Sequence, residues 1–168
     1  MTWNLALLLP SDTNFKWKKR IDEPLMDFFN ESDWLHIFPD VTSVGQFEDL
    51  MNMDCGQCFV AYNPASNISL GFIYVYFEDV RQKKVSVHGG SWTPNLTMLN
   101  YRAYIMLIEA LLNQGYKVRT ACRLDNIKAT RFNKGIGFVN HYTSKNYRYF
   151  WISEKRLYSS KIYKRLIA

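Results

Sequence analysis

The run from Lys83 to Phe138 constrains the fold of this chain more than any other stretch. It contains two strand candidates, each followed by a helix candidate, and Gly115 and Gly137 lie near the ends of the two helices. In order, the segments are a strand at 84–92, a turn at 93–95, a helix at 99–114, a strand at 116–122 and a short helix ending at 135–138. A helical crossover of this kind predicts parallel pairing of the two strands. We expect the functional site at their carboxyl ends, beside a helix N-terminus.

The remaining segments predict one α/β domain over residues 1–168, with an α+β mixed sheet. Strands at 58–62 and 70–77 precede the parallel unit as an antiparallel meander, and strands at 139–143 and 147–152 form a closing hairpin. The predicted sheet is therefore mostly antiparallel and twisted, with a central parallel pair and helices on both faces. We assign 57–152 to the core sheet.

The first 56 residues are expected to be mostly helical and to form the acceptor-side region. Thr2–Leu9 predicts an opening strand, and Pro24 starts a helix at Leu25–Asn30. Ser43 is the predicted cap of a second helix that ends at Met51.

The chain carries a net charge of +6, and its distribution is uneven. The tail at 153–168 has five basic residues against Glu154 alone. A solvated terminal helix is favoured there over a contact with nucleic acid or the ribosome. No signal core or membrane-length apolar run is found, so we expect a cytoplasmic protein without a membrane partner.

Three cysteines include a CxxC pair at Cys55 and Cys58. A thioredoxin-like pair precedes a helix, whereas this pair precedes the β run at 59–62. Structural zinc needs four ligands, and His36, His88 and His141 show no second closely spaced ligand pair. We expect no metal, and a structural role for Cys58 at the start of a strand.

The order of elements and the pattern Asn126-x-x-Ala129-x-x-Phe132-x-x-x-x-Gly137-Phe138 resemble the GNAT superfamily of N-acyltransferases over residues 57–152. The resemblance implies a GNAT-like fold that binds acetyl-CoA or another acyl-CoA. Asn126 would cap a helix near the pantetheine arm, and Ala129 would leave room for the cofactor. These two roles also suit the residues themselves, since Asn is a good N-cap.

The resemblance also implies the other cofactor contacts, which we place on the strand end and the turn after it. Backbone groups near Gly90 would pair with the pantetheine amides, and the pyrophosphate loop would fall on 95–100. The residues assigned to cofactor binding are Gly90, Trp92, Asn95, Leu96, Thr97, Met98, Leu99, Asn100, Asn126 and Ala129. The loop departs from the family pattern, because Met98 and Asn100 replace the small residues that let a backbone approach phosphates.

The catalytic residues are predicted to be His88 and Ser91. His88 is the candidate general base, because an imidazole titrates near neutral pH; a hydrogen-bonded structural histidine is the alternative. Ser91 belongs to the strand end whose backbone would hold the pantetheine. Asn133 occupies the position of the tyrosine that often serves as the acid in this family. Gly89 and Gly90 are alternatively the sign of a β-bulge.

Two functions from different classes remain open at this point. The first is acyl-CoA-dependent transfer of an acetyl or similar group to a primary amine, which is a small molecule, peptide or protein. The second is a catalytically inactive GNAT-like interaction protein, encoded by a phage or mobile element, that has lost CoA binding. Acceptor determinants would lie in the first third and in the closing hairpin, where Tyr147 and Tyr149 share a strand face.

Overall fold

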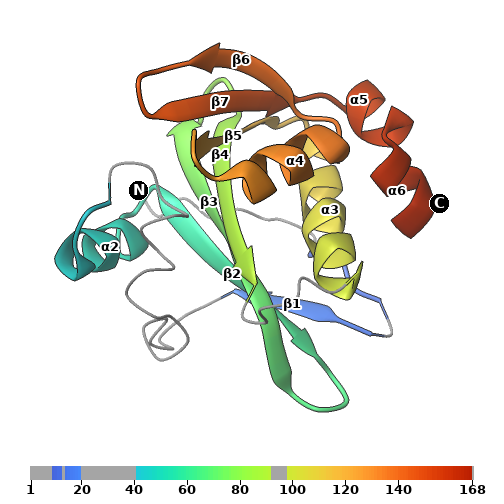
Figure 1. The fold of residues 1–168 in the computed structure, drawn as a ribbon. Helices are drawn as coiled ribbons and strands as arrows, with labels where there is room; N and C mark the ends of the chain where they lie inside the picture. Colours follow the sequence, from blue (N-terminus) through green and yellow to red (C-terminus); the bar gives the residue numbers. More distant parts are fainter. Residues whose placement is uncertain (1–8, 13, 20–40, 92–97, 168) are drawn as a thin grey trace.

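The computed structural model describes residues 9–12, 14–19, 41–91 and 98–167, and these residues form a seven-stranded mixed sheet with helices on both faces (Figure 1). The strand order is β1-β2-β3-β4-β5-β7-β6. The pairing is antiparallel except between β4 and β5, which are parallel. The strands are β1 (Lys16–Lys19), β2 (Gly56–Asn63), β3 (Ile68–Asp79), β4 (Lys84–Ser91), β5 (Lys117–Arg123), β6 (Val139–Thr143) and β7 (Tyr147–Ile152). This confirms the predicted fold class, including the central parallel pair.

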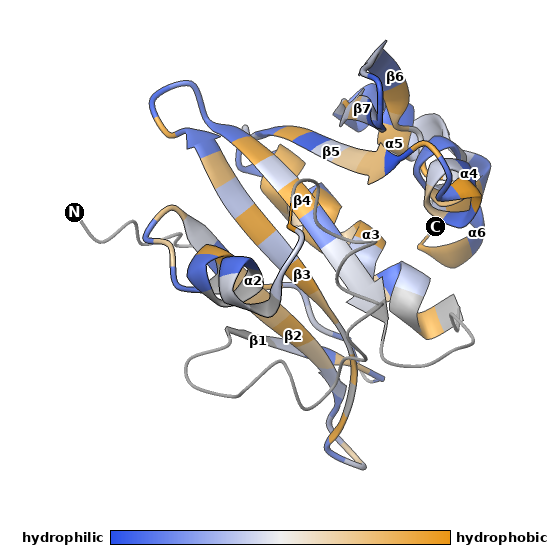
Figure 2. Cartoon of the chain, turned by 60° about the vertical axis from the view of Figure 1, so that its left-hand side comes forward, coloured by the Kyte–Doolittle hydropathy of each residue, from blue (hydrophilic) through white to orange (hydrophobic). Residues whose placement is uncertain are grey.

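Alternating side chains divide the sheet into two faces. On β3, Ile73 and Val75 belong to the main hydrophobic core, whereas Phe72 and Tyr74 point to the opposite face and are buried there. The hydroxyl of Tyr74 donates to the Leu50 carbonyl, 2.6 Å away, at the end of helix α2 (Val44–Met51). Figure 2 shows α2 and α3 on opposite sides of the sheet. We call the α3 side the core face and the α2 side the cavity face.

Helix α3 (Met98–Asn113) covers the core face with a stripe of side chains at helical spacing. Leu107, Ile108 and Leu111 are fully buried on it. The helix ends before Gly115, whose φ of +82° is the left-handed conformation that glycine adopts at low cost. No helix among the described residues has the length and apolar composition to cross a membrane.

The described part of the amino-terminal third contains the expected helix α2 and also a strand. Ser43 does cap α2, since its Oγ accepts from the Gln46 N–H at 3.2 Å. Strand β1, however, was not predicted; it lies at the edge of the sheet with Trp17 buried beside Ala61 of β2. The predicted strand at 2–9 lies outside the described residues except for its last residue, and the helix at 25–30 lies wholly outside them.

The basic tail forms two helices, α5 (Glu154–Ser159) and α6 (Lys161–Leu166), rather than a single solvated one. Leu157 is fully buried in the core, and the Tyr163 hydroxyl donates to Glu109 of α3 at 2.6 Å. The Arg102 guanidinium of α3 donates to the Leu166 carbonyl at 2.8 Å. The tail is therefore packed on α3 through its apolar side.

Helix α4 (Ile127–Gly135) ends in a Schellman arrangement. The Phe138 N–H donates to the Asn133 carbonyl at 2.9 Å and the Gly137 N–H to the Lys134 carbonyl at 3.2 Å, with Gly137 at φ +107°. A Cβ at Gly137 would lie 2.6 Å from the Arg156 carbonyl oxygen. This glycine sets both the helix end and the close approach of α5.

Gly137→Ala should therefore destabilise the fold by more than about 1 kcal/mol, because alanine resists this φ and collides with backbone. Gly45→Ala is the matched control, since a Cβ at Gly45 in α2 meets nothing within 4 Å. That change should be neutral or stabilise by about 0.5–1 kcal/mol. Urea unfolding measures both, and equal effects of the two substitutions would contradict the assignment.

Candidate active site

The parallel strands β4 and β5 pair over a short distance and then separate. Within the described residues their ladder contains three pairs, from Lys84 with Lys117 to Ser86 with Arg119. Beyond it, β4 continues against β3 as far as Ser91, and β5 continues against β7 as far as Arg123. A gap between the parallel strands thus opens after Ser86.

Thr120 bridges the two strands at the point where they separate. Its buried hydroxyl donates to the Val87 carbonyl across the gap at 2.8 Å. This bond takes the place of the next rung of the ladder and satisfies a carbonyl that the separation would leave unpaired.

His88 is the first residue of β4 on the cavity face after the ladder ends. Its Nε2 lies 3.3 Å from the Ser86 Oγ, which is on the same face two residues earlier. Both side chains are half-buried and line a cavity of about 1240 Å³. The structure thus places the predicted base at the mouth of the gap, while its catalytic role remains a prediction.

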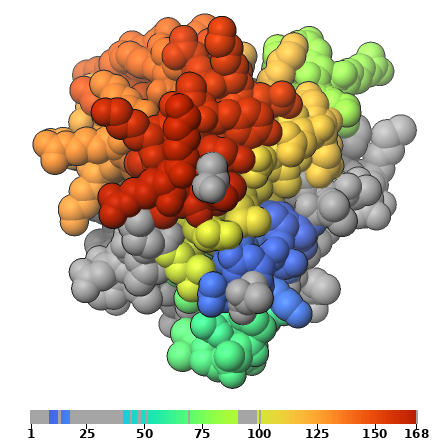
Figure 3. All heavy atoms as spheres, turned by 90° about the vertical axis from the view of Figure 1, so that its right-hand side faces the viewer, coloured from blue at the N-terminus to red at the C-terminus, as the bar shows by residue number. Residues whose placement is uncertain are grey.

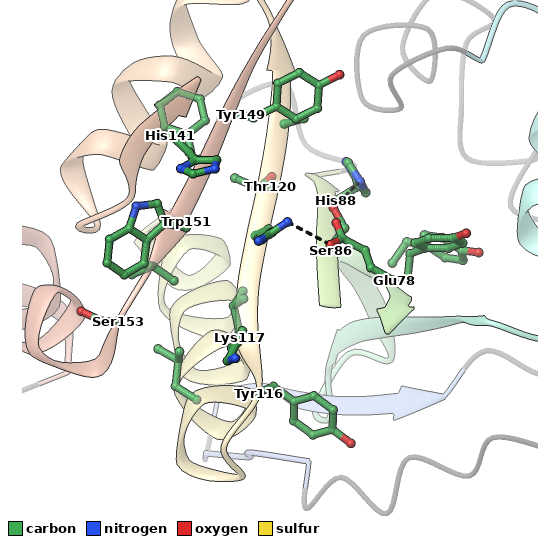
Figure 4. Close-up of a pocket in the computed structure, with 18 of the residues that line it drawn as sticks. Glu78, Ser86, His88, Tyr116, Lys117, Thr120, His141, Tyr149, Trp151 and Ser153 are labelled. Atoms are coloured by element: carbon green, nitrogen blue, oxygen red, sulfur yellow. Dashed lines mark hydrogen bonds and ion pairs between the residues drawn. The ribbon is translucent and has the colours of Figure 1, made fainter. Parts of the chain in front are cut away.

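The cavity lies on the cavity face and is drawn in Figure 4, where His88 and Ser86 lie across β5 from His141 and Trp151. Strands β3, β4, β5 and β7 supply most of its walls, and α2 contributes Leu50. The closing hairpin lines it with His141, Tyr142 and residues 149–152. The polar and aromatic side chains in the lining include Tyr76, Glu78, Ser86, His88, Tyr116, Lys117, Arg119, His141, Tyr149 and Trp151.

An ion pair between Glu78 and Arg119 crosses the cavity floor and was not predicted. The Arg119 Nη1 lies 3.4 Å from the Glu78 Oε2, and both side chains remain partly exposed. Arg119 is in register with Ser86, so β4 and β5 present it beside the candidate base. The sequence shows both residues in strands, but the pairing that brings them together joins positions 41 residues apart.

Aromatic rings form the wall on the hairpin side. Tyr149 stacks on Tyr142 with ring centroids 4.3 Å apart. Trp151 is 40% exposed and lies under the Arg156 guanidinium, 5.8 Å from the ring centroid. Tyr149 lines the cavity, although core packing was the favoured role for it, and Tyr147 on the same strand face is not among the lining residues.

Helix α4 has the predicted cap, while its cofactor contacts remain predictions. The Asn126 Oδ1 accepts from the Ala129 N–H at 3.0 Å, which confirms the N-cap. Ala129 and Phe132 pack inward against the core. Asn133, seven residues after the cap, is buried, so this position supplies no acid to the cavity.

The remaining predicted cofactor residues lie at the end of β4 and the start of α3. Gly90 pairs with Phe72 and Ser91 with Gly71, and Leu99 is half-buried against the core. Met98 and Asn100 belong to the first turn of α3, but their side chains lie outside the description. Trp92, Asn95, Leu96 and Thr97 also lie outside the described residues.

The alternative of a β-bulge at Gly89 and Gly90 is wrong. Both residues continue the regular ladder with β3, opposite Ile73 and Phe72. The requirement for glycine at position 89 comes from packing instead, since a Cβ there would lie 2.6 Å from the Tyr104 ring. Burial raises the pKa of the Tyr104 hydroxyl well above its ordinary value.

The cysteines do not form a recognisable redox or metal site in the described part of the chain. Cys55, Cys58 and Cys122 are all free thiols, and no group of three or more His, Cys, Asp or Glu residues there could hold a metal ion. Cys122 lies 3.3 Å from the Thr130 hydroxyl, and burial raises the pKa of its thiol. Cys58 is buried in β2, in agreement with the structural role expected for it.

Comparison with known proteins identifies the fold as that of the GNAT N-acetyltransferases. No model of a known protein family and no curated protein sequence matches this chain. Several solved structures do match it in fold. The Vibrio cholerae spermidine N-acetyltransferase in complex with CoA and spermine matches with a TM-score of 0.64 at 10% identity, over 88% of this chain and 100% of that one.

Two further structures extend the similarity. The Campylobacter jejuni N-acetyltransferase PseH in complex with acetyl coenzyme A has a TM-score of 0.59 at 15% identity, over 83% of this chain and 99% of that one. FdhC, described as a nucleotide-linked sugar GNAT, has a TM-score of 0.61 at 13% identity, over 93% of this chain and 96% of that one. At these identities the likeness establishes the fold alone.

Thr120→Val should destabilise the protein by roughly 1–3 kcal/mol, because the Val87 carbonyl loses its buried donor while the side-chain volume is kept. Thr120→Ser retains the hydroxyl and should recover part of that loss. Denaturant unfolding of the three proteins tests this. If valine is tolerated as well as serine, the hydroxyl bridge does not hold the strands.

Proposed function

We propose that this protein is an acyl-CoA-dependent N-acyltransferase. The observation that carries the proposal is the position of His88, on the cavity face at the point where β4 and β5 separate. A GNAT fold with an open gap there provides a donor side and an acceptor side that meet at one residue. The acyl-CoA would enter from the α3–α4 side, and the amine from the cavity.

The residues present fit an acyl-CoA on the donor side. The end of β4 at Gly90 has no partner on β5, so its backbone is available to the pantetheine amides. Helix α3 has 16 residues, and the N–H groups in the first turn of a helix have no partner within the helix, so the start of α3 suits a phosphate. Helix α4 begins after the end of β5, and Asn126 caps it through the Ala129 N–H. The contacts of residues 92–100 remain predictions.

The proposed chemistry is direct transfer. The amine nitrogen attacks the thioester carbonyl carbon, a C–N bond forms, and the C–S bond breaks. His88 accepts the proton that the amine loses, and the leaving thiolate takes a proton from water, because Asn133 cannot supply one. Ser86, 3.3 Å from the imidazole, orients the ring.

The charged side chains that line the cavity favour one class of acceptor amine over another. Lys117, Arg119 and Lys155 line it together with Glu78 and Glu154, so cations exceed carboxylates. Such a lining does not favour a polyamine such as the spermine bound to the Vibrio neighbour. An amine that also carries a carboxylate or phosphate fits better, since Arg119 can bind either group bidentately.

The inactive alternative is supported by two features: the buried Asn133 in place of the family's tyrosine, and Met98 and Asn100 in place of the small residues of the pyrophosphate loop. In that case the GNAT fold would serve as an interaction protein without CoA. A measurement of acetyl-CoA binding distinguishes the two proposals, and it does not require the acceptor amine to be known.

Acetyl-CoA at about 100 times its dissociation constant should stabilise the protein by about 2.7 kcal/mol. For a chain of this size that corresponds to a rise in Tm of roughly 5–11 °C. Thermal unfolding in millimolar acetyl-CoA, with ATP as the control anion, makes the measurement. An unchanged Tm in acetyl-CoA would favour the inactive interaction protein.

His88→Ala should lower kcat with an accepted amine by about 10²–10⁴-fold, the usual contribution of a general base. It should also flatten the acid limb of the pH–rate profile, while acetyl-CoA still stabilises the variant. Ser86→Ala is the comparison: it removes the contact to the imidazole and should have a smaller effect. Unchanged kinetics of His88→Ala would assign His88 a structural role.

A further inference from the structure

The positive charge of this protein is concentrated in its last quarter. Residues 127–168 hold ten of the 21 Lys and Arg residues but one of the 15 acidic residues, Glu154. That segment therefore carries +9, and residues 1–126 carry −3. A segregation of this size favours a surface for a polyanion over a uniformly solvated chain.

The fold gathers most of these charges on neighbouring helices. On α4, Lys128, Arg131 and Lys134 follow one another at three-residue intervals and are all exposed, so they form one stripe along the helix. On α5 and α6 the exposed basic residues are Lys155, Arg156, Lys161, Lys164 and Arg165. We call these eight residues the basic face.

Close packing joins the two halves of the basic face. A Cβ at Gly135 of α4 would lie 2.6 Å from the Ile162 side chain of α6. The α4 end approaches α5 equally closely, at Gly137 and the Arg156 carbonyl. Figure 3 shows the surfaces of α4, in orange, and of the C-terminal helices, in red, adjoining on one side of the molecule.

The basic face is not neutralised by the acidic residues that the structure describes. Among the described residues, ion pairs join Arg102 to Asp12, Arg119 to Glu78 and Arg123 to Asp125. None of these pairs includes a residue of the basic face. The isoelectric point of the whole chain, about 9.2, is in the range typical of nucleic-acid-binding domains.

We propose that the basic face binds nucleic acid through its backbone phosphates. This inference is independent of the proposed acyl transfer. A membrane surface is a poorer partner, because a helix that enters a bilayer needs a free apolar side. The apolar residues of α5 and α6, such as Leu157, Ile162 and Leu166, are already packed into the core. The exposed ring of Tyr158 at its border is available for stacking on an unpaired base.

Binding is tested by fluorescence anisotropy with a labelled 20-nucleotide RNA strand and the corresponding RNA duplex, from 50 to 200 mM KCl. Affinity should fall steeply with salt, because phosphate contacts release counterions. The test variant carries Lys128→Gln, Arg131→Gln and Lys134→Gln. It should bind at least about 10-fold more weakly and lower the salt slope by about 2–3.

The control variant carries Lys16→Gln, Arg81→Gln and Lys145→Gln, three exposed residues that do not belong to the basic face. It removes the same net charge and should bind nearly as well as the wild type. Circular dichroism and Tm verify that both variants are folded.

Several results would overturn the proposal. Equal losses in the two variants would show a general charge effect, and no RNA binding by the wild type at 50 mM KCl would exclude this partner. Displacement of RNA by millimolar CoA would assign the α4 stripe to the cofactor instead. Stronger binding to vesicles of 30% phosphatidylserine than to RNA would indicate a membrane surface.

Discussion

The brevity of the parallel ladder between β4 and β5 is the constraint on which the site depends. A longer ladder would pair the backbone groups of both strands and leave no gap. The strands separate because each has a stronger neighbour: β4 remains paired with β3 to Ser91, and β5 with β7 to Arg123. Thr120 replaces the missing rung and fixes where the gap begins. Beyond that point the described residues of β4 and β5 form no further pairs with each other.

The same strands give the two faces of the sheet different roles. Residues such as Val85 and Val87 build the core under α3, while Ser86 and His88, between and after them, line the cavity on the other side. The period of two makes this division automatic once one face is buried. A cofactor bound on the α3 side and an acceptor bound in the cavity would therefore meet through the gap rather than compete for one surface.

Elements with strong local signals were predictable. The cap at Asn126, the glycine at position 137 and the hairpin at 139–152 are encoded by residues close in sequence, and the structure confirms them. Strand β1 was missed because Lys16–Lys19 contains one apolar residue, Trp17, and owes its conformation to pairing with β2 some 40 residues later. The Glu78–Arg119 ion pair escaped prediction for the same reason, since it depends on strand order and register.

The sequence by itself determined the order of strands and helices from α2 to β7, the caps at Ser43 and Asn126 and the excess of positive charge near the carboxyl terminus, because each of these is a local property of the chain. Only the tertiary structure decided where β4 and β5 separate, which charged and aromatic side chains surround His88, and that α4 joins α5 and α6 in one basic face. Those features arise from contacts between residues distant in sequence, whose geometry no local pattern specifies.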